Sequence, residues 1–596
     1  MAHMISWLAF IYFLTMSFSA DGAIFHVSSF GAYSDDNMDD TRAIQSTVDT
    51  AISYGANNTI ILGIGTYYLL STIAIYNATN LTIQGQGMNQ TLLIGTTPTS
   101  VFYSKYCHGL TISSLSIEYY PHPFTAGYLV TVNSTYLDVK IQPPHQADAG
   151  RQVVSLFRYD PIAMRPAFGL NAYQFYQQPP HDVNTSLISE DIVRIPLKYR
   201  TKFVVGDAVV VVYLAHFHTI EVKYMTDVTF QSITIVNSWF MGLVTLQVRR
   251  LTITDYHVKR RVGFWLSTNA DCMHLTDSRE YVSVSNTHCQ STGDDALAVH
   301  AVYFLVTEII NSTTMMMEVF NWFDPIDVGD STTLQFSTSR KPFTAYINGT
   351  VACSKSNSSN FRIFTFTSPL NVSVGDFACV ADSPILTVRN HTAENTRGRG
   401  ALIQTHNVDL RHSVFNQTSA PAILFQPSLY WHDGPPARNV TLTENLYIRC
   451  NEGISQHQGM ITFLPDPVQF IPVFDDIRIE SSTFLFGYDS QGLLQSNNVN
   501  NLTINGNYIA LNSSTPIISI CNSRNISAHN NTVVNTKGKI DKYYVFDPTE
   551  PCQTNLTSLI DLPPSAFNSS FPPPVLLTMT STTNDQNHSI NEKLRL

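Results

Sequence analysis

Short segments that alternate apolar and polar residues recur along this chain of 596 residues at a nearly constant spacing. Neighbouring segments begin at Val228 and Leu251, at Leu386 and Val408, and at Ile477 and Leu502. This spacing is too long for hairpins and too short for strand–helix–strand units. A fixed period of roughly 20 to 50 residues is typical of stacked repeat folds, and the alternation predicts strands. We therefore expect an all-β chain wound as a right-handed parallel β-helix.

An all-β sandwich is the structural alternative. A sandwich would show a turn signal at intervals of roughly 8–12 residues and no longer fixed period. Here the segments recur over most of the chain, beginning at Leu81, Leu110, Val228, Leu251, Val282, Leu386, Val408, Val440, Ile477 and Leu502. The longer period favours the β-helix.

The composition agrees with this fold and narrows the class of partner. Charged residues are 13% and aromatic residues 11% of the chain, and long helical patterns are nearly absent. The formal net charge is −11, and Lys and Arg form no basic stripe, which argues against nucleic acid. We expect a neutral partner.

Residues 39–52 predict a helix ahead of the first repeats. Asp40 or Thr41 can cap its start, and its apolar face comprises Ala43, Ile44, Val48, Ala51 and Ile52. Because the open end of a β-helix exposes an unpaired strand edge and the core, we expect this helix to cover that end. Residues 59–62 then form the first strand.

Two long interruptions, at about 120–222 and 301–384, divide the β-helix that we expect over residues 24–540. Both carry the turn Val-Gly-Asp, which occurs at residues 205–207, 328–330 and 374–376. Gly-Asp before an apolar alternation marks a tight turn into a strand, so we expect small inserted antiparallel β-modules. Residues 545–596 are rich in Pro, Ser, Thr and Asn, which predicts a disordered tail.

The N-terminal residues and the sequons predict secretion. Residues 5–18 are apolar, shorter than the roughly 20 residues of a membrane span, and followed by small residues, which predicts a signal peptide over residues 1–20 and no stable membrane insertion. About twenty Asn-x-Ser/Thr sequons follow, among them Asn77, Asn133, Asn311, Asn416 and Asn525. We expect a glycosylated eukaryotic protein of the extracellular space or the endomembrane lumen.

Eight cysteines, with neither CxxC pairs nor zinc spacing, predict disulfides in such a compartment. We expect Cys353 to pair with Cys379 and Cys521 with Cys552. Buried free thiols remain the alternative for Cys107 and Cys450.

Three carboxylates recur at the period of the repeats. Asp294 follows Asp271 after about one period, and Asp295 comes directly after Asp294. Successive strands lie roughly 4.8 Å apart, so we expect the three side chains to meet on one face, where such acids can hydrolyse a glycosidic bond. A purely structural polar ladder stays open, because Asp-Asp pairs also occur at 35–36, 39–40 and 475–476.

Two sets of motifs resemble known families. Residues 35–45, followed by Gly65-Thr66-Tyr67, resemble the N-terminal signature of pectin-lyase-like β-helix proteins. Over most of residues 24–455 the chain is similar to glycoside hydrolase family 110, through Asn269-Ala270-Asp271, Gly293-Asp294-Asp295 with His300, Arg397-Gly398-Arg399-Gly400 and Trp431-His432-Asp433-Gly434. It departs from that family at Cys272-Met273, where Gly and a larger apolar residue are commoner, and at Asp433, where Glu is usual.

The second resemblance implies a function. Members of that family are exo-acting, inverting α-1,3-galactosidases, so the resemblance implies a glycan with terminal α-galactose as substrate, Asp271 as the acid, and Asp294 and Asp295 as bases. Candidate substrate-binding residues are His274, His300, Arg397, Arg399, Trp431 and Asp433. The histidines and arginines can instead support the acids. Phe264 and Trp265 can stack on a sugar or pack in the core.

The residues also lead to expectations about mechanism. No cluster has metal-ligand spacing, so we expect no metal and no cofactor. Inversion requires roughly 6.5–9.5 Å between the acid and base carboxyl groups. Residues stacked at the coil spacing are closer than that, so we expect the side chains to splay apart.

Two other functions stay open. Polygalacturonases share the Asn-x-Asp and Asp-Asp arrangement but add Gly-His-Gly and Arg-x-Lys motifs that bind acidic sugars, and neither motif follows Asp295. The other open function is that of a secreted carbohydrate-binding β-helix without catalysis. The three aspartates argue against it. The sequence does not determine the oligomeric state.

Overall fold

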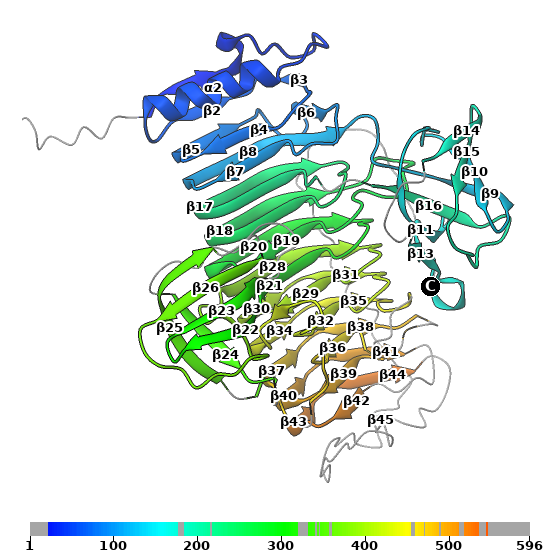
Figure 1. Cartoon of the computed structure of the whole chain (residues 1–596). Helices are drawn as coiled ribbons and strands as arrows, with labels where there is room; N and C mark the ends of the chain where they lie inside the picture. The colour runs from blue at the N-terminus through cyan, green and yellow to red at the C-terminus, as the bar shows by residue number, and fades with distance from the viewer. Residues whose placement is uncertain are drawn as a thin grey trace, which may run out of the picture.

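The computed structural model describes residues 22–545, with gaps at 177–183, 215–216, 320–331, 340–341, 345, 357–359, 454–458, 470, 488–489, 491, 512–517 and 536–543. Within these residues, 31 strands form one sheet that winds along the molecule. Figure 1 shows the coils stacked in a ladder from the blue N-terminal end to the orange C-terminal end. The predicted right-handed parallel β-helix is confirmed.

The predicted repeats stack residue on residue. Leu81 lies beside Leu110, and the row continues through Val228, Leu251, Val282, Leu386, Val408, Val440, Ile477 and Leu502. Their strands are β5 (Thr79–Gln84), β8 (His108–Tyr119), β17 (Ile220–Ile235), β18 (Leu243–Val258), β20 (Arg279–Gln290), β28 (Ile385–Glu394), β30 (His406–Arg411), β34 (Arg438–Thr443), β37 (Phe474–Glu480) and β40 (Val499–Asn505). The whole row is buried. Burial contributes roughly 1.5–3 kcal/mol per such side chain, and a one-residue slip would turn the row to solvent, so it specifies the register.

A helix covers the N-terminal end of the coil, as predicted. Helix α2 (Thr41–Tyr54) lies across the first coils in Figure 1 and buries Ile44, Val48 and Ala51 against them. Strand β1 (Ile24–His26) precedes the helix and pairs in parallel with β2 (Thr59–Ile61), so the coil begins one strand earlier than expected.

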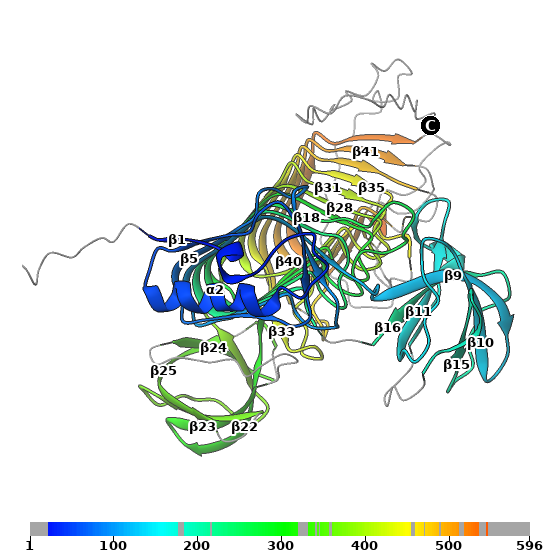
Figure 2. The same ribbon diagram turned by 90° about the horizontal axis from the view of Figure 1, so that it is seen from above.

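The first interruption forms an antiparallel sheet of eight strands. The strands are β9 (Phe124–Val132), β10 (Tyr136–Ile141), β11 (Val153–Asp160), β12 (Arg165–Pro166), β13 (Gln174–Tyr176), β14 (Ser186–Ser189), β15 (Ile192–Pro196) and β16 (Ala208–Tyr213). Figure 2 shows this module, in cyan, beside the coil. A buried ion pair between Arg165 and Glu452, 3.0 Å apart, ties the module to a later coil.

The second interruption forms a closed barrel of six strands. The strands are β22 (Phe304–Asn311), β23 (Thr314–Val319), β24 (Thr333–Ser337), β25 (Tyr346–Ser356), β26 (Phe361–Phe366) and β27 (Phe377–Val380). Figure 2 shows the barrel, in green, apart from the first module. The predicted inserted antiparallel modules are therefore confirmed.

The Gly-Asp turns behave as expected where they are described. Gly206 and Gly375 have φ angles of 94° and 90°, a left-handed conformation that costs glycine least. Asp207 and Asp376 then accept backbone N–H bonds from Val204 and Ser373. The third turn, at 328–330, lies outside the described residues.

One disulfide joins Cys272 to Cys289. The predicted pair of Cys353 and Cys379 is wrong, because both are free thiols. They lie on β25 and β27, which are separated by β24 in the barrel.

Cys521 is disulfide-bonded, but Cys552 lies outside the described residues, so that pair stays a prediction. Cys107 and Cys450 are buried free thiols, the alternative foreseen for them. The expected signal peptide and nearly all of the expected tail also lie outside the described residues. Among the residues that are described, no helix has the length and apolar character needed to cross a membrane.

Candidate active site

Three stacked strands carry the candidate site in the turns that precede them. They are β19 (Met273–Thr276), β21 (Leu297–Val302) and β29 (Ala401–Gln404), and their first residues pair in parallel. Asp271, Asp295 and Arg399 each stand two residues before a first residue. They therefore occupy the same position on three consecutive coils.

This register corrects one expectation. The sequence spacing suggests that Asp294 stacks on Asp271, because the two residues lie one typical period apart. Met273 pairs with Leu297, however, so the coil here is one residue longer and Asp295 is the residue in register with Asp271. The backbone N–H of Asp295 accordingly donates to Asp271 Oδ1 at 3.2 Å. Asp294 is the chain neighbour of Asp295 at the cavity side.

The three carboxylates form one cluster. One oxygen from each of Asp271, Asp294 and Asp295 lies within 4.8 Å of the others. Asp271 and Asp295 are buried, whereas the side chain of Asp294 is 39% exposed. The expected splaying stays a prediction, because the roughly 6.5–9.5 Å common in inverting enzymes is the separation of whole carboxyl groups, whereas the 4.8 Å limit applies to one oxygen of each acid.

Arg397 and Arg399 hold two of the acids. Arg397 Nη2 donates to Asp294 Oδ2 at 2.9 Å. Arg399 Nε donates to both oxygens of Asp295 at 2.8 and 2.9 Å, and its backbone N–H donates to Oδ1 at 2.7 Å. The predicted arginines therefore contact the acids, which was the alternative to direct sugar binding.

The cluster changes the acidity of Asp295. Burial raises its pKa, the Arg399 guanidinium lowers it, and the nearby Asp294 and Asp271 carboxylates raise it further, to about 7 overall. Two guanidinium groups face three carboxylates, so the cluster favours holding a proton near neutral pH. Burial lowers the pKa of Arg399, but Asp295 and the other two carboxylates together raise it by more.

Two histidines and a fourth carboxylate adjoin Asp271. His274 Nδ1 lies 2.6 Å from Asp271 Oδ2, and its Nε2 lies 3.0 Å from His300 Nε2. His300 Nδ1 lies 3.2 Å from Asp433 Oδ1. These three residues, predicted as sugar binders, form a connected chain behind the acid.

The three aspartates, Asp271, Asp294 and Asp295, are the one place among the described residues where three acidic, His or Cys side chains converge closely enough for a metal ion. Arg397 and Arg399 already donate hydrogen bonds to Asp294 and Asp295. A cation there would have to displace guanidinium groups and would meet their charge. The donor set therefore suits an acid–base site better than a metal site.

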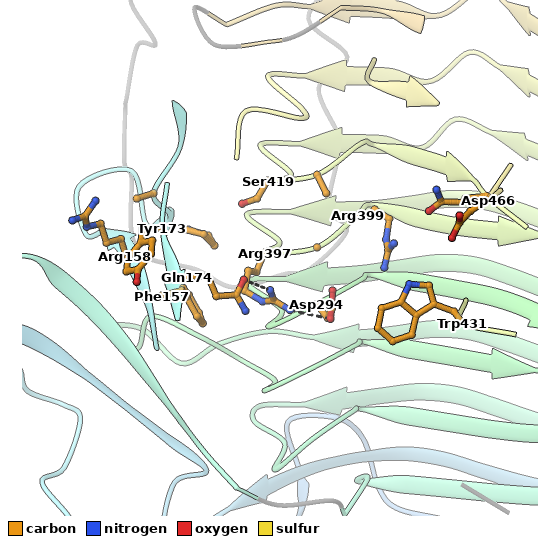
Figure 3. Close-up of a pocket in the computed structure, with 15 residues that line it drawn as sticks. Phe157, Arg158, Tyr173, Gln174, Asp294, Arg397, Arg399, Ser419, Trp431 and Asp466 are labelled. Carbon is orange, nitrogen blue, oxygen red and sulfur yellow. Dashed lines mark hydrogen bonds and ion pairs between the residues drawn. The ribbon is translucent and has the colours of Figure 1, made fainter. Parts of the chain in front are cut away.

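A cavity of about 470 Å³ opens in front of Asp294. This lies within the usual range of ligand sites, roughly 300–1,000 Å³. Figure 3 shows Asp294 with Arg397 between residues of the first module and Trp431, which is 53% exposed. Its lining comprises Phe157, Arg158, Pro166, Ala167, Tyr173, Gln174, Asp294, Arg397, Gly398, Arg399, Ser419, Ala420, Gln426, Trp431 and Asp466.

Sequence reasoning missed the wall that the first module supplies. Phe157, Tyr173 and Gln174 come from that module, and Gln174 Oε1 accepts a hydrogen bond from Arg397 Nη1 at 2.7 Å. These residues lie far from Asp294 in sequence and repeat with no period, so no sequence signal connected them to the site. Ser419, Gln426 and Asp466 were missed likewise, although the repeat placed Ser419 one coil after Arg397.

Gly398 leaves the space that the carboxylates fill. A Cβ atom on it would lie 2.5 Å from Asp294 Oδ1 and 2.5 Å from Asp295 Oδ1. The Arg-Gly-Arg sequence thus places a cation on each side of the two acids without a side chain between them.

Phe264 and Trp265 do not line this cavity. Both are 6% exposed, and Trp265 stacks on Tyr159 of β11 with ring centroids 5.0 Å apart. They pack the first module onto the coil, which was the alternative to sugar stacking.

Comparison with known proteins agrees with the fold and the motifs. Residues 24–107 match the family model of rhamnogalacturonase A/epimerase, pectate lyase-like proteins. The chain is 22% identical over 399 residues to alpha-1,3-galactosidase A of Shewanella woodyi, covering 62% of this chain and 64% of that relative. It is also 22% identical over 295 residues to alpha-1,3-galactosidase B of Phocaeicola vulgatus, covering 46% of this chain and 47% of that relative.

These matches span less than two thirds of the length of either relative. Among solved structures, the family 28 exopolygalacturonase of Yersinia enterocolitica is similar with a TM-score of 0.45 and 11% identity, over 89% of this chain and 78% of that chain. The sequence matches confirm the resemblance to α-1,3-galactosidases and to pectin-lyase-like proteins.

Proposed function

We propose that this protein is a glycoside hydrolase that removes terminal α-1,3-linked galactose from glycans by a metal-free, inverting mechanism. The observation that carries the proposal is the cluster of Asp271, Asp294 and Asp295, of which Asp294 lines a cavity of about 470 Å³. The similarity to two proteins named alpha-1,3-galactosidase supports the choice of sugar and linkage.

The three acids divide the two proton transfers of hydrolysis. Asp271 gives its proton to the glycosidic oxygen as the C–O bond breaks. Asp294 or Asp295 takes a proton from water as the water oxygen bonds to the anomeric carbon. Arg397 and Arg399 place positive charge beside these two candidate bases, but burial and the crowding of carboxylates still raise the pKa of Asp295 to about 7, so Asp295 can act as the base only where it has lost its proton.

The charges of the cavity favour a neutral sugar. Each of its three arginines faces a carboxylate: Arg158 contacts Asp207, Arg397 contacts Asp294, and Arg399 contacts Asp295. Recognition of an acidic sugar would require a cation available to its carboxylate. This pairing argues against a polygalacturonase-like substrate.

Two walls flank Asp294 in the cavity. The first module contributes one wall, with Tyr173 and Gln174, and Trp431 stands on the other side of Asp294 (Figure 3). The exposed indole offers an apolar face for a pyranose ring.

Incubation of the full chain with galactosyl-α-1,3-galactose and, in parallel, with polygalacturonate tests the activity and the substrate class. We expect free galactose from the first substrate and no cleavage of the second. Binding of the galactoside without release of galactose would instead support a non-catalytic carbohydrate-binding protein. Cleavage of polygalacturonate would contradict the argument from arginine pairing.

The stereochemistry needs its own test. Inversion is implied by the resemblance, whereas retention would require two carboxyl groups roughly 5–5.5 Å apart, one of which attacks the sugar. Proton NMR in the first minutes of hydrolysis separates the two. We expect β-galactose first, and α-galactose as first product would show that a carboxylate attacks the sugar.

We also propose that the protein is secreted and N-glycosylated. Four of the five sequon asparagines named above, Asn77, Asn133, Asn311 and Asn525, are exposed. The disulfide between Cys272 and Cys289 suits an oxidising compartment. After expression in eukaryotic cells, we expect the protein in the culture medium, with a mass that falls on treatment with an N-glycosidase. Unglycosylated protein retained in the cytosol would contradict this proposal.

A further inference from the structure

Behind Asp271 runs an unbroken chain of ionisable side chains. It passes from Asp271 Oδ2 to His274 Nδ1 at 2.6 Å, from His274 Nε2 to His300 Nε2 at 3.0 Å, and from His300 Nδ1 to Asp433 Oδ1 at 3.2 Å. All three distances lie within hydrogen-bonding range; the first two contacts are hydrogen bonds and the third is an ion-pair contact. His274 belongs to β19 and His300 to β21, and Asp433 belongs to β33 (Asp433–Gly434), which pairs with the end of β21.

One end of this chain has a fixed proton position. His300 Nδ1 faces two acceptors, the Asp433 carboxylate and the Ala301 carbonyl oxygen at 3.3 Å. A carbonyl oxygen only accepts hydrogen bonds, so Nδ1 must carry a proton. The remaining question is which groups carry the protons of the other two contacts.

Counting protons answers it. Three contacts join the ionisable groups, and each needs one proton to be a hydrogen bond, whereas Thr276 Oγ1, 3.3 Å from His300 Nε2, brings its own hydroxyl proton. Two neutral imidazoles supply only two N–H groups. The third proton resides either on Asp271, with both histidines neutral, or on the histidines as an imidazolium, with Asp271 ionised.

We propose that His274, His300 and Asp433 are positioning residues that hold this third proton and keep it available at Asp271 for the leaving group. The inference rests on the proposed function and extends it, because the acid becomes a four-residue unit rather than one carboxyl group. When Asp271 has given its proton to the glycosidic oxygen, its contact with His274 is left without a proton. Uptake of a proton from water by the chain then restores the starting state.

The charges around His300 agree with this role. Burial lowers the pKa of His300, but the Asp433 carboxylate, the Ala301 carbonyl oxygen and the Asp271 carboxylate together raise it by more, so that the pKa lies above its usual value. The other groups near it are Asp271, Asp277, Arg279, His274 and the exposed Asp382. Asp277 lies 3.5 Å from Arg279 and accepts a hydrogen bond from Gln247, so its charge is compensated locally. Asp433 is the carboxylate in direct contact with the imidazole.

The variant Asp433→Asn tests the role directly. Its amide oxygen can still accept the Nδ1–H bond, but the negative charge that holds the third proton is lost. We expect the alkaline limb of kcat/KM to move down by about one pH unit, with a loss of roughly tenfold above the limb. The control is Glu394→Gln, which removes the charge from another carboxylate–histidine pair, Glu394 and His288 at 3.1 Å, away from Asp271.

A second substrate separates proton donation from general damage. A dinitrophenyl α-galactoside has a leaving group that departs without a proton. Asp433→Asn and His300→Gln should therefore lose much less activity on it than on galactosyl-α-1,3-galactose. An unmoved alkaline limb in Asp433→Asn, or equal losses on both substrates, would overturn the proposal.

A measurement without substrate keeps this inference distinct from the proposed function. Imidazole N–H protons in short hydrogen bonds to carboxylates resonate at low field in proton NMR. We expect such a signal in the wild type and its loss in His300→Gln. Absence of the signal from the wild type would refute the proposed chain of hydrogen bonds from Asp271 to Asp433. A wild type with the signal but without any hydrolysis would refute the glycosidase function and, with it, the assignment of this proton to catalysis.

Discussion

Replacing Gly398 with alanine tests whether the acids must lie where the structure places them. The new Cβ would lie 2.5 Å from one oxygen of Asp294 and 2.5 Å from one oxygen of Asp295, whereas ordinary contact begins at 3.4 Å. Both carboxylates would have to retreat by about 0.9 Å, and the backbone of Asp294 would have to move with them, because its carbonyl carbon would lie 2.6 Å from the same Cβ. A displacement of about 1 Å in an active site costs roughly 10²-fold in rate, or ~2.7 kcal/mol. We therefore expect kcat/KM of Gly398→Ala to fall about 100-fold.

The assay is galactose release, read together with the unfolding midpoint. Gly95→Ala is the matched control, since its Cβ would lie 2.5 Å from the Tyr119 ring, in a coil remote from the acids. We expect the control to lower the midpoint while leaving kcat/KM per folded molecule near that of the wild type. Full activity in Gly398→Ala would refute the reasoning, because the acids could then move without consequence.

Three further predictions concern the same cluster. The variants Asp271→Asn, Asp294→Asn and Asp295→Asn should each lose roughly 10²–10⁴-fold in kcat with unchanged circular dichroism, and wild-type turnover would remove that residue from the mechanism. Activity should survive dialysis against EDTA, since Arg397 and Arg399 fill the carboxylate contacts, and loss that a divalent ion restores would contradict this. Folded Asp295, with its pKa raised to about 7, binds its proton more tightly than the unfolded chain does. The contribution of Asp295 to the free energy of unfolding is therefore complete below about pH 4 and is lost as the pH rises through 7. Between pH 5 and 8 the unfolding midpoint of the wild type should fall relative to that of Asp295→Asn. Parallel plots of midpoint against pH for the two proteins would contradict the shift.

The coil could be predicted from sequence because its information is periodic. Residues such as Leu251 and Val282 mark the same inward position on successive coils, and each one-residue slip would expose an apolar side chain. The spacing between segments is not constant, however, because the turns between strands differ in length. The exact partner of Asp271 therefore required the hydrogen-bond register, and Asp295 rather than Asp294 proved to be in line with it.

The non-periodic parts of the site could not be predicted in this way. Gln174 and Arg397 lie 223 residues apart, yet they share a hydrogen bond across the cavity. The pairing of Cys272 with Cys289, only 17 residues apart, also escaped prediction because it is shorter than one coil. Such contacts depend on how the first module docks and how one turn folds, and neither leaves a pattern along the chain.

The balance of charge distinguishes the candidate site from other ion pairs on the coil. Arg249 and Arg250 face Asp227 and Glu280, two cations for two carboxylates, and hydrogen bonds from the arginines lower the pKa of both acids. Such a matched group has no reason to hold a proton near neutral pH.

At the candidate site, stacking at the coil spacing brings Asp271, Asp294 and Asp295 together, but the next coil supplies only Arg397 and Arg399. Burial and the unmatched carboxylate together raise the pKa of Asp295 rather than lower it. Hydrolysis of a glycoside needs one acid that has kept its proton beside one that has lost it. The register of β19 with β21 places one carboxylate more than it places guanidinium groups on neighbouring coils, so Asp295 can hold a proton near neutral pH, while the proton that Asp271 donates is the one that it shares with His274.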